Sequence, residues 1–302
     1  MESTDLQAIV ASPEATRVLI ELFVNHGRAY HRDAATFQTG AHFGPWRDLF
    51  IKAKLVHPGE DNFQLTDLGK TLGYGLLEKD NLDKRHGNSL SDPVDIPLSP
   101  ASIYAGKNIV DIGCGSGCYA NDASLLGAKT VIGIDVQFPL LQVGHILRGT
   151  SHALFLAGFA ECLPIGAATT DTVILRGALP YIDNDWLLSE AARISRPGSV
   201  LLITGLGPGY FISALLNSLT QLKPIRAFYL VVVIANSLLF ALSGHRLPFK
   251  IKKYFSRELV SIFHTKMGLR RVLAKHGYSI STYKSHKIFG FCSHFFVHTT
   301  RL

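Results

Sequence analysis

The chain reads Asn108-Ile-Val-Asp-Ile-Gly-Cys-Gly-Ser-Gly-Cys-Tyr119, which is a short apolar strand followed directly by three glycines at alternate positions. An α/β protein uses a strand followed by glycines to bring backbone N–H groups and a helix N-terminus close to a charged or polar ligand. Gly113, Gly115 and Gly117 lack the Cβ atoms that would block this approach. Asp111 lies two residues before the first glycine, where its carboxylate can accept hydrogen bonds from an ammonium group or from the N–H groups of the loop.

A second acid follows this loop at an informative distance. The apolar strand Thr130-Val-Ile-Gly-Ile-Asp135 ends in Asp135, 22 residues past Gly113. That spacing places a carboxylate at the tip of the neighbouring strand, where it can hold the two hydroxyls of a ribose; capping of the next helix is the alternative. A dinucleotide fingerprint would need its third glycine three residues after the second, and Cys118 stands there.

From Asn108 to about Thr204 the chain resembles the class I methyltransferases that use S-adenosylmethionine. The segments that carry the resemblance are Val110-Asp-Ile-Gly-Cys-Gly-Ser-Gly117, Gly133-Ile-Asp135, Gly158-Phe-Ala-Glu-Cys-Leu-Pro164, Asp171-Thr-Val-Ile-Leu-Arg176 and Glu190-Ala-Ala-Arg-Ile-Ser-Arg-Pro-Gly-Ser-Val-Leu-Leu-Ile-Thr204. The resemblance implies a methyl-transferring enzyme with an α/β fold: a Rossmann-like, seven-stranded, mostly parallel sheet with helices on both faces. The alternation of strands and helices up to residue 205 independently predicts such a sheet.

The resemblance also implies where the cofactor binds. In this family the glycine loop holds the methionine part, the acid after the second strand takes the ribose, and the Ala-Glu-x-Leu-Pro element frames the adenine. The expected cofactor contacts are Asp111, Gly113, Cys114, Gly115, Gly117, Asp135, Val136, Ala160, Glu161 and Arg176. The chain departs from the family at Phe159, where an acid commonly accepts the adenine amino group. Phe159 either stacks on the adenine or packs in the core.

Family members place substrate-contacting groups just after the fourth strand, which here continues as Arg176-Gly-Ala-Leu-Pro-Tyr-Ile-Asp183. Tyr181 is the predicted catalytic-site residue, as a wall of the site or as a proton acceptor, with simple packing as the alternative. Arg176 contacts the cofactor or an acidic substrate group, or forms a structural ion pair. His152 and His264 are candidate bases that no motif places at the site, so the base stays unassigned.

Composition sets broader bounds. A chain of 302 residues with 47% hydrophobic content can bury a large core in one or two domains. Its four cysteines form neither a paired framework nor a metal-ligand pattern, so no metal is predicted and a reducing, cytoplasmic location is expected. The acidic, polar start of the chain does not resemble a signal peptide. Residues 209–302 carry 14 Lys and Arg but a single acid, which hints at an anionic partner or surface there.

The organisation expected along the chain has three parts. Residues 1–80 read as helix, helix, hairpin and helix, and this order resembles a winged-helix module. The first hundred residues have 10 Lys and Arg against 14 acids, which disfavours nucleic-acid binding and favours dimerisation or a roof over the active site. Residues 81–105 are expected to be a linker or active-site loop, and residues 106–302 the methyltransferase domain.

An apolar, basic insert is predicted at 209–268, with helices at Phe211–Leu219 and Ala227–Leu242. A helix of sixteen residues spans about 24 Å, which is short of the roughly 30 Å hydrocarbon core, so a transmembrane span is not expected. Three interpretations stay open: a buried lid over a hydrophobic acceptor pocket, a peripheral membrane contact through 209–253, and a dimer-interface helix.

The predicted function is therefore methyl transfer from S-adenosylmethionine to a hydrophobic small molecule, such as a natural product, a quinone or a lipid-like compound, in a biosynthetic pathway. The alternative is a methyltransferase that acts on RNA or on a peptide held by the basic C-terminal third. A non-catalytic protein that only senses the cofactor is the least favoured reading.

Overall fold

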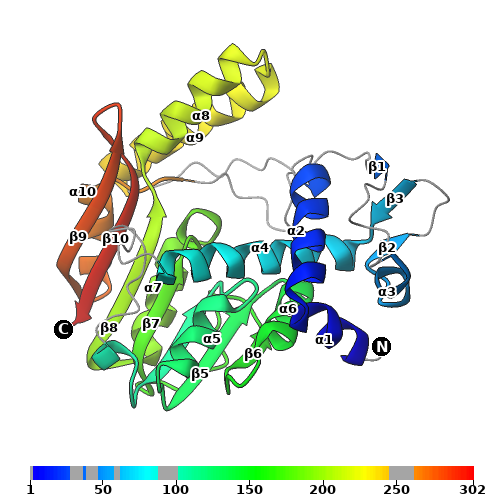
Figure 1. Ribbon diagram of the computed structural model, residues 1–302. Helices are drawn as coiled ribbons and strands as arrows, with labels where there is room; N and C mark the ends of the chain where they lie inside the picture. Colours follow the sequence, from blue (N-terminus) through cyan, green and yellow to red (C-terminus); the bar gives the residue numbers. More distant parts are fainter. Residues whose placement is uncertain (1–2, 28–36, 39–46, 58–61, 88–100, 245–261) are drawn as a thin grey trace.

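The computed structural model describes residues 3–27, 37–38, 47–57, 62–87, 101–244 and 262–302 (Figure 1). Its centre is a seven-stranded sheet in the order β6-β5-β4-β7-β8-β10-β9. Five strands run parallel and the last two are antiparallel, β10 to β8 and β9 to β10. The parallel strands are β4 (Asn108–Ile112), β5 (Thr130–Asp135), β6 (Leu154–Ala157), β7 (Thr170–Arg176) and β8 (Ser195–Leu206), and the antiparallel ones are β9 (Tyr278–Ile288) and β10 (Phe291–Arg301). The predicted seven-stranded, mostly parallel sheet is confirmed.

Helices cover both faces of this sheet, as predicted, because successive strand residues point to opposite sides. On β4, Ile109 joins a core formed with α5 (Cys118–Leu125) and α6 (Phe138–Leu147), whereas Val110 joins a core on the other face. The second core is completed by α7 (Asn184–Ile194) and α10 (Lys266–Lys275). Central strands buried on both faces explain the nearly continuous apolar runs in the sequence.

The N-terminal part contains the kinds of element that the sequence predicts, although its resemblance to a winged helix stays a prediction. The helices are α1 (Ser3–Ala11), α2 (Pro13–Gly27), α3 (Arg47–Lys52) and α4 (Asp67–Gly87), and the small sheet has the order β1-β3-β2, from Phe37–Gln38, Asn62–Leu65 and Val56–His57. Residues 44–46 and 58–61, within the predicted order of helix, helix, hairpin and helix, lie outside the described residues.

α4 is longer than predicted and packs against α5 and α6 of the catalytic half, by which we mean the part of the chain from residue 106 onward. It begins after Thr66, whose hydroxyl accepts the N–H of Gly69 at 3.0 Å as an N-terminal cap. It ends at Gly87, so the first residues of the predicted 81–105 linker are helical, while 88–100 lie outside the described residues. The N-terminal helices share one continuous hydrophobic core with α5, α6 and one face of the sheet, and Figure 1 shows α4 crossing over these elements.

The predicted insert forms two antiparallel helices, α8 (Pro208–Thr220) and α9 (Pro224–Ser243), which project beyond the sheet (Figure 1). α9 has 20 residues and spans about 30 Å, so the expectation of a helix too short for a membrane was wrong on length. Within the described chain it is the one helix long and apolar enough to cross a bilayer by length and composition. Only 33% of its apolar window is buried, so a fully buried lid does not describe it either. Residues 245–261 of the insert lie outside the described residues.

The close approach of α4 to the catalytic half depends on Gly75. A Cβ atom at this position would lie 2.4 Å from Cγ1 of Val143 on α6 and 3.2 Å from Cβ of Ser116. We therefore expect Gly75→Val to lower the free energy of unfolding by about 1–3 kcal/mol through overpacking, measured by urea denaturation. Lys70→Val, at a partly exposed position of the same helix, controls for the helix propensity of valine. Equal losses in the two variants would contradict this account of the α4 contact.

Candidate functional site

The glycine loop turns sharply at the carboxyl end of β4. Gly113, Gly115 and Gly117 have φ of +71°, +55° and +70°, a left-handed region that side chains with a Cβ rarely adopt. The N–H groups of Gly113 and Cys114 donate to the carbonyl of Ile134, at 2.7 and 3.1 Å, which fastens the start of the loop to β5. Gly117 is the N-cap of α5, so the loop leads directly into a helix N-terminus.

The loop also lies too close to its neighbours for larger residues. A Cβ on Gly117 would lie 2.2 Å from the ring of Phe155 on β6, and a Cβ on Gly113 would lie 2.8 Å from the Cβ of Ala178. The second contact shows that the segment after β7, where the acceptor-side residues are predicted, packs directly on the glycine loop. The predicted cofactor-binding loop and the predicted acceptor segment are therefore neighbours.

Asp135 has a structural role that the sequence did not reveal. Its Oδ2 accepts the N–H of Gly115 at 2.9 Å, and its Oδ1 accepts the N–H of Gln137 at 2.8 Å. The carboxylate thereby holds the middle of the glycine loop against the end of β5 and the start of α6. Each carboxylate oxygen can accept a further hydrogen bond, so the expected contact with a ribose stays a prediction alongside this role.

Asp111 is buried and its Oδ1 makes no hydrogen bond with the described residues. Burial raises the pKa of this carboxyl to about 7; Arg176 opposes the shift, and the carboxylates of Glu78 and Asp135 add to it. A buried acceptor without a partner costs free energy unless a donor reaches it. A ligand ammonium is such a donor, and it would favour the ionised carboxylate.

Glu78 on α4 is a site residue that sequence reasoning missed. Its Oε1 accepts a hydrogen bond from Nη1 of Arg176 at 2.7 Å, and its Oε2 accepts one from the hydroxyl of Ser116 in the glycine loop. The guanidinium of Arg176 also stacks over the ring of Tyr119, 4.6 Å from its centre. Of the interpretations of Arg176, the ion pair is observed, while its cofactor contact stays a prediction.

The charges around the loop are mainly negative. Asp111, Asp135 and Glu78 bring three carboxyl groups to the loop, against the single guanidinium of Arg176 among these four residues. Such a site attracts a cationic ligand more strongly than an anionic one. No motif marks Glu78, because it lies 38 residues before Ser116 and reaches the loop only through the packing of α4.

The predicted adenine side lies beyond β6. Ala160 is buried, Glu161 is partly buried, and the exposed Val136 follows the end of β5. Phe159 is 50% exposed, which argues against the core-packing interpretation and leaves stacking on the adenine as a prediction. The segment is held from behind by Glu190, whose Oε2 accepts the N–H of Leu163 at 2.7 Å.

Tyr181 ends a short 3₁₀ helix, Leu179–Tyr181, beyond the carboxyl end of β7, and it is 58% exposed. The pKa of its phenol is raised by partial removal from water, and the phenols of Tyr210 on α8 and Tyr229 on α9 add to the shift. A phenol with a raised pKa stays protonated at neutral pH, and the roles of Tyr181 as a wall or as a proton acceptor both stay predictions.

Of the candidate histidine bases, His152 lies beside α5, whereas His264 lies beside Asn184, the residue that directly follows the acceptor segment 176–183. His152 is paired with the hydroxyl of Ser124 on α5, with 2.8 Å between Nδ1 and Oγ. His264 is buried beside Asn184, with 3.1 Å between Nε2 and Nδ2. Neither histidine is brought to the glycine loop, so the base stays unassigned.

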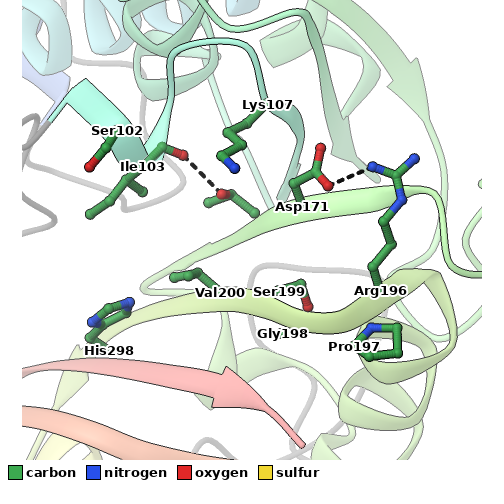
Figure 2. Close-up of a pocket in the computed structure, with 11 residues that line it drawn as sticks. Ser102, Ile103, Lys107, Asp171, Arg196, Pro197, Gly198, Ser199, Val200 and His298 are labelled. Atoms are coloured by element: carbon green, nitrogen blue, oxygen red, sulfur yellow. Dashed lines mark hydrogen bonds and ion pairs between the residues drawn. The ribbon is translucent and has the colours of Figure 1, made fainter.

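A separate pocket of about 380 Å³ lies at the opposite, amino ends of the parallel strands (Figure 2). Its lining includes Lys107, which precedes β4, and an ion pair of 2.6 Å between Arg196 and Asp171 at the start of β7. None of the predicted cofactor residues lines it. Ligands of open α/β sheets bind at the carboxyl ends of the strands, so the glycine loop, and not this pocket, is the candidate site.

Comparison with known proteins finds similarity over the part of the chain that contains the glycine loop. Residues 110–203 match a family described as a methyltransferase domain. O-methyltransferase cnsE of Penicillium expansum is 29% identical over 156 residues, which cover 49% of this chain and 55% of that protein. Ubiquinone biosynthesis O-methyltransferase of Mesorhizobium japonicum is 27% identical over 106 residues, covering 34% and 42% of the two chains.

A protein-modifying enzyme is among the relatives as well. Ribosomal protein L11 methyltransferase of Azotobacter vinelandii is 33% identical over 106 residues, covering 34% of this chain and 35% of that protein. The chain thus spans about half, or less, of the length of the curated relatives that it matches. Among solved structures, magnesium protoporphyrin IX methyltransferase from Synechocystis with bound SAH is 15% identical, with a TM-score of 0.48, and covers 87% of this chain and 95% of that one. Residues 110–203 of the chain are thus similar to a methyltransferase domain.

Proposed function

We propose that this protein transfers the methyl group of S-adenosylmethionine to a hydrophobic small molecule. The observation that carries the proposal is the buried Oδ1 of Asp111, which has no hydrogen-bond partner among the described residues and lies beside a loop of three left-handed glycines. This arrangement fits the amino-acid end of the cofactor, because its ammonium would supply the donor that Asp111 lacks. Asp135 would hold the ribose, and Ala160, Glu161 and Phe159 would frame the adenine.

When bound, S-adenosylmethionine supplies a methyl group already activated on a sulfonium. The chain's own tasks are to orient the two reactants in line and to keep water away from them. The glycine loop fixes one end of this line, and Ala178, which packs on Gly113, fixes the start of the acceptor segment. Tyr181 then forms a wall of the acceptor side together with Tyr210 and Tyr229.

The expected hydrophobic acceptor is supported by the residues around this wall. Tyr210 stands near the start of α8, next to an apolar cluster that joins α8 and α9 and contains Phe211, Leu230, Val233 and Phe263. This buried cluster makes the neighbourhood of the acceptor segment apolar, which favours a natural product, a quinone or a lipid-like compound over a polar metabolite. One relative is named for ubiquinone biosynthesis.

The N-terminal helices are proposed to roof the cofactor site. α4 contributes Glu78 to the glycine loop and to Arg176, so this part of the chain completes the site instead of standing beside it. A homodimer through the same part stays a prediction. The reaction is proposed to take place in the cytoplasm, where free cysteines remain reduced.

An RNA or peptide acceptor is the second candidate. It is favoured by the excess of 14 basic residues over one acid in 209–302 and by the relative that is named for a ribosomal protein. Salt-sensitive binding of RNA, together with turnover on RNA or peptide but not on apolar acceptors, would select this alternative.

Binding of S-adenosylhomocysteine, followed by titration calorimetry, tests the assigned residues. We expect Asp111→Asn and Asp135→Ala to weaken binding about tenfold or more, because each removes a charge-assisted hydrogen bond worth about 1.5–3 kcal/mol. Asp171→Asn is the matched control, since Asp171 lies at the opposite end of the sheet beside Arg196. Unchanged affinity in Asp111→Asn, or no binding by the unmodified protein, would contradict the proposed site.

The pKa of about 7 at Asp111 predicts a pH dependence of binding. Below pH 7 a ligand ammonium must displace the proton of Asp111, so affinity should rise up to about tenfold per pH unit and level off above pH 7. Calorimetry in buffers of different ionisation enthalpy should detect release of a proton near pH 6 and little near pH 8. Asp111→Asn should lose this pH dependence; a wild-type affinity that stays flat from pH 5.5 to 8 would contradict it.

Asp111 also predicts how the stability of the ligand-free protein depends on pH, and here the change with rising pH is a decrease, whereas ligand affinity increases. The folded pKa of Asp111 lies above its ordinary value of 3.8, so the protonated acid stabilises the ligand-free fold. The free energy of unfolding should therefore fall as pH rises from about 4 to about 7, by up to about 1.4 kcal/mol per unit from this group, and then level. Urea titrations of the wild type and Asp111→Asn isolate this contribution; identical pH profiles in the two proteins would refute it.

Turnover separates the interpretations of Tyr181 and of the acceptor. Release of S-adenosylhomocysteine is measured with a long-chain fatty acid, a prenylated quinol, an RNA oligonucleotide and a peptide. We expect an apolar acceptor to be used, Tyr181→Phe to keep most of kcat/KM, and Tyr181→Ala to lose about tenfold through the missing wall. A large loss in Tyr181→Phe with a displaced pH profile would instead identify the phenol as a proton acceptor.

A further inference from the structure

We infer that the α8–α9 hairpin docks with its tip on the surface of an anionic lipid bilayer. The hairpin tip is defined here as the turn between the two helices and the first turns beside it, residues 219–228. This inference adds a location to the proposed function and does not depend on the identity of the acceptor. It rests on three observations: the exposure of the tip, the anchoring of the root and the distribution of charge.

The hairpin tip is apolar where a helix connection is normally polar. Leu222, in the turn itself, is 87% exposed and has a φ of +50°, and Ile225 is 85% exposed. Phe228 is 68% exposed, and Leu219 on α8 is exposed as well. An aromatic and three aliphatic side chains gathered at the end of a projecting hairpin are a surface patch that marks an interaction site.

The apolar surface continues from the tip along one side of α9. Ile225, Phe228 and Val231 are exposed at helical spacing, and Leu238 and Leu242 extend the same stripe. Neither aspartate nor glutamate occurs anywhere in the two helices. A helix with such a stripe can lie in the interface of a bilayer with its apolar side chains among the lipid tails.

The root of the hairpin, by contrast, is held firmly by the catalytic half. Phe211, Leu230, Val233 and Phe263 form a buried cluster there. The hydroxyl of Ser237 accepts the N–H of Phe263 at 3.0 Å, and Arg271 of α10 donates to the carbonyls of Ala241 and Leu242. Figure 1 shows the two helices leaving the body side by side, so the tip stands away from the rest of the described chain.

The charges of the hairpin indicate which partner binds its tip. Lys223 and Arg226 are both exposed and flank the apolar turn, with no acid in either helix to balance them. A second copy would present the same two cations and no acid from its own hairpin, so it offers no charge complement at the tip. A bilayer with anionic head groups supplies negative charge at its surface and apolar tails beneath, which matches both features of the tip.

Docking would also let the hairpin deliver an acceptor from the membrane to the site, a role that rests on the proposed function. Tyr210 at the start of α8 and Tyr229, which follows the tip on α9, are the two phenols that influence Tyr181. A membrane-dissolved acceptor that leaves the bilayer along the hairpin would therefore arrive beside the wall of the acceptor site.

Vesicle co-sedimentation of the full chain tests the inference. Vesicles of phosphatidylcholine alone are compared with vesicles that contain roughly one third phosphatidylserine, at low and high salt. We expect at least tenfold stronger partitioning to the anionic vesicles, a loss of that preference in Lys223→Ser/Arg226→Ser, and at least tenfold weaker partitioning of Leu222→Glu/Ile225→Glu. Leu125→Glu is the matched control, because Leu125 at the end of α5 is 61% exposed but lies outside the hairpin.

Each outcome has a defined meaning. Absence of binding to anionic vesicles, or equal binding by Leu222→Glu/Ile225→Glu and the wild type, overturns the inference. A wild-type dimer in sedimentation analysis that Leu222→Glu/Ile225→Glu dissociates, without any vesicle binding, assigns the patch to a second copy instead. Circular dichroism and calorimetry with S-adenosylhomocysteine show whether the variants fold. Vesicle binding without ligand binding would overturn only the proposed function, and ligand binding without vesicle binding would overturn only the docking.

Discussion

The two hydrogen bonds that Asp135 accepts, from Gly115 and from Gln137, set the shape of the whole cofactor end of the sheet. They join the middle of the glycine loop to the tip of β5 and to the start of α6 with one carboxylate. The loop can then keep its left-handed turns and lead directly into the N-terminus of α5. Asp111 beneath it stays buried because the loop above it is held closed.

Much of the fold follows from local sequence. The apolar runs at 108–112, 130–135 and 170–176 each became a strand of the parallel sheet, because a strand buried on both faces leaves a pattern that few other structures share. The glycine loop was equally readable, since its positive φ angles restrict the residue type directly. The ends of helices were harder: the extension of α4 to Gly87 was missed, and so was the full length of α9, although Pro224 at its start and the left-handed Gly244 at its end mark its limits.

The site was only partly predictable for a related reason. Asp111, Asp135 and Arg176 lie at the carboxyl ends of β4, β5 and β7, which are neighbours in the sheet, so topology alone brings them together. Glu78 reaches the same place from another part of the chain, through a glycine that lets α4 descend and through a shared core. Contacts of this kind depend on tertiary packing and leave no spacing in the sequence. The exposure of the hairpin tip could not be predicted from the sequence either, because the same apolar residues would also suit a buried helix.

The bond between Glu78 and Ser116 has a thermodynamic consequence for the chain as a whole. Because one partner belongs to the N-terminal helices and the other to the loop, whatever steadies the loop also favours the seating of α4, and the coupling acts with equal strength in the reverse direction. We therefore expect substitutions that loosen α1 or α2 to weaken ligand binding as well, because these helices share one core with α4. The stability of the N-terminal helices and the stability of the glycine loop are therefore coupled.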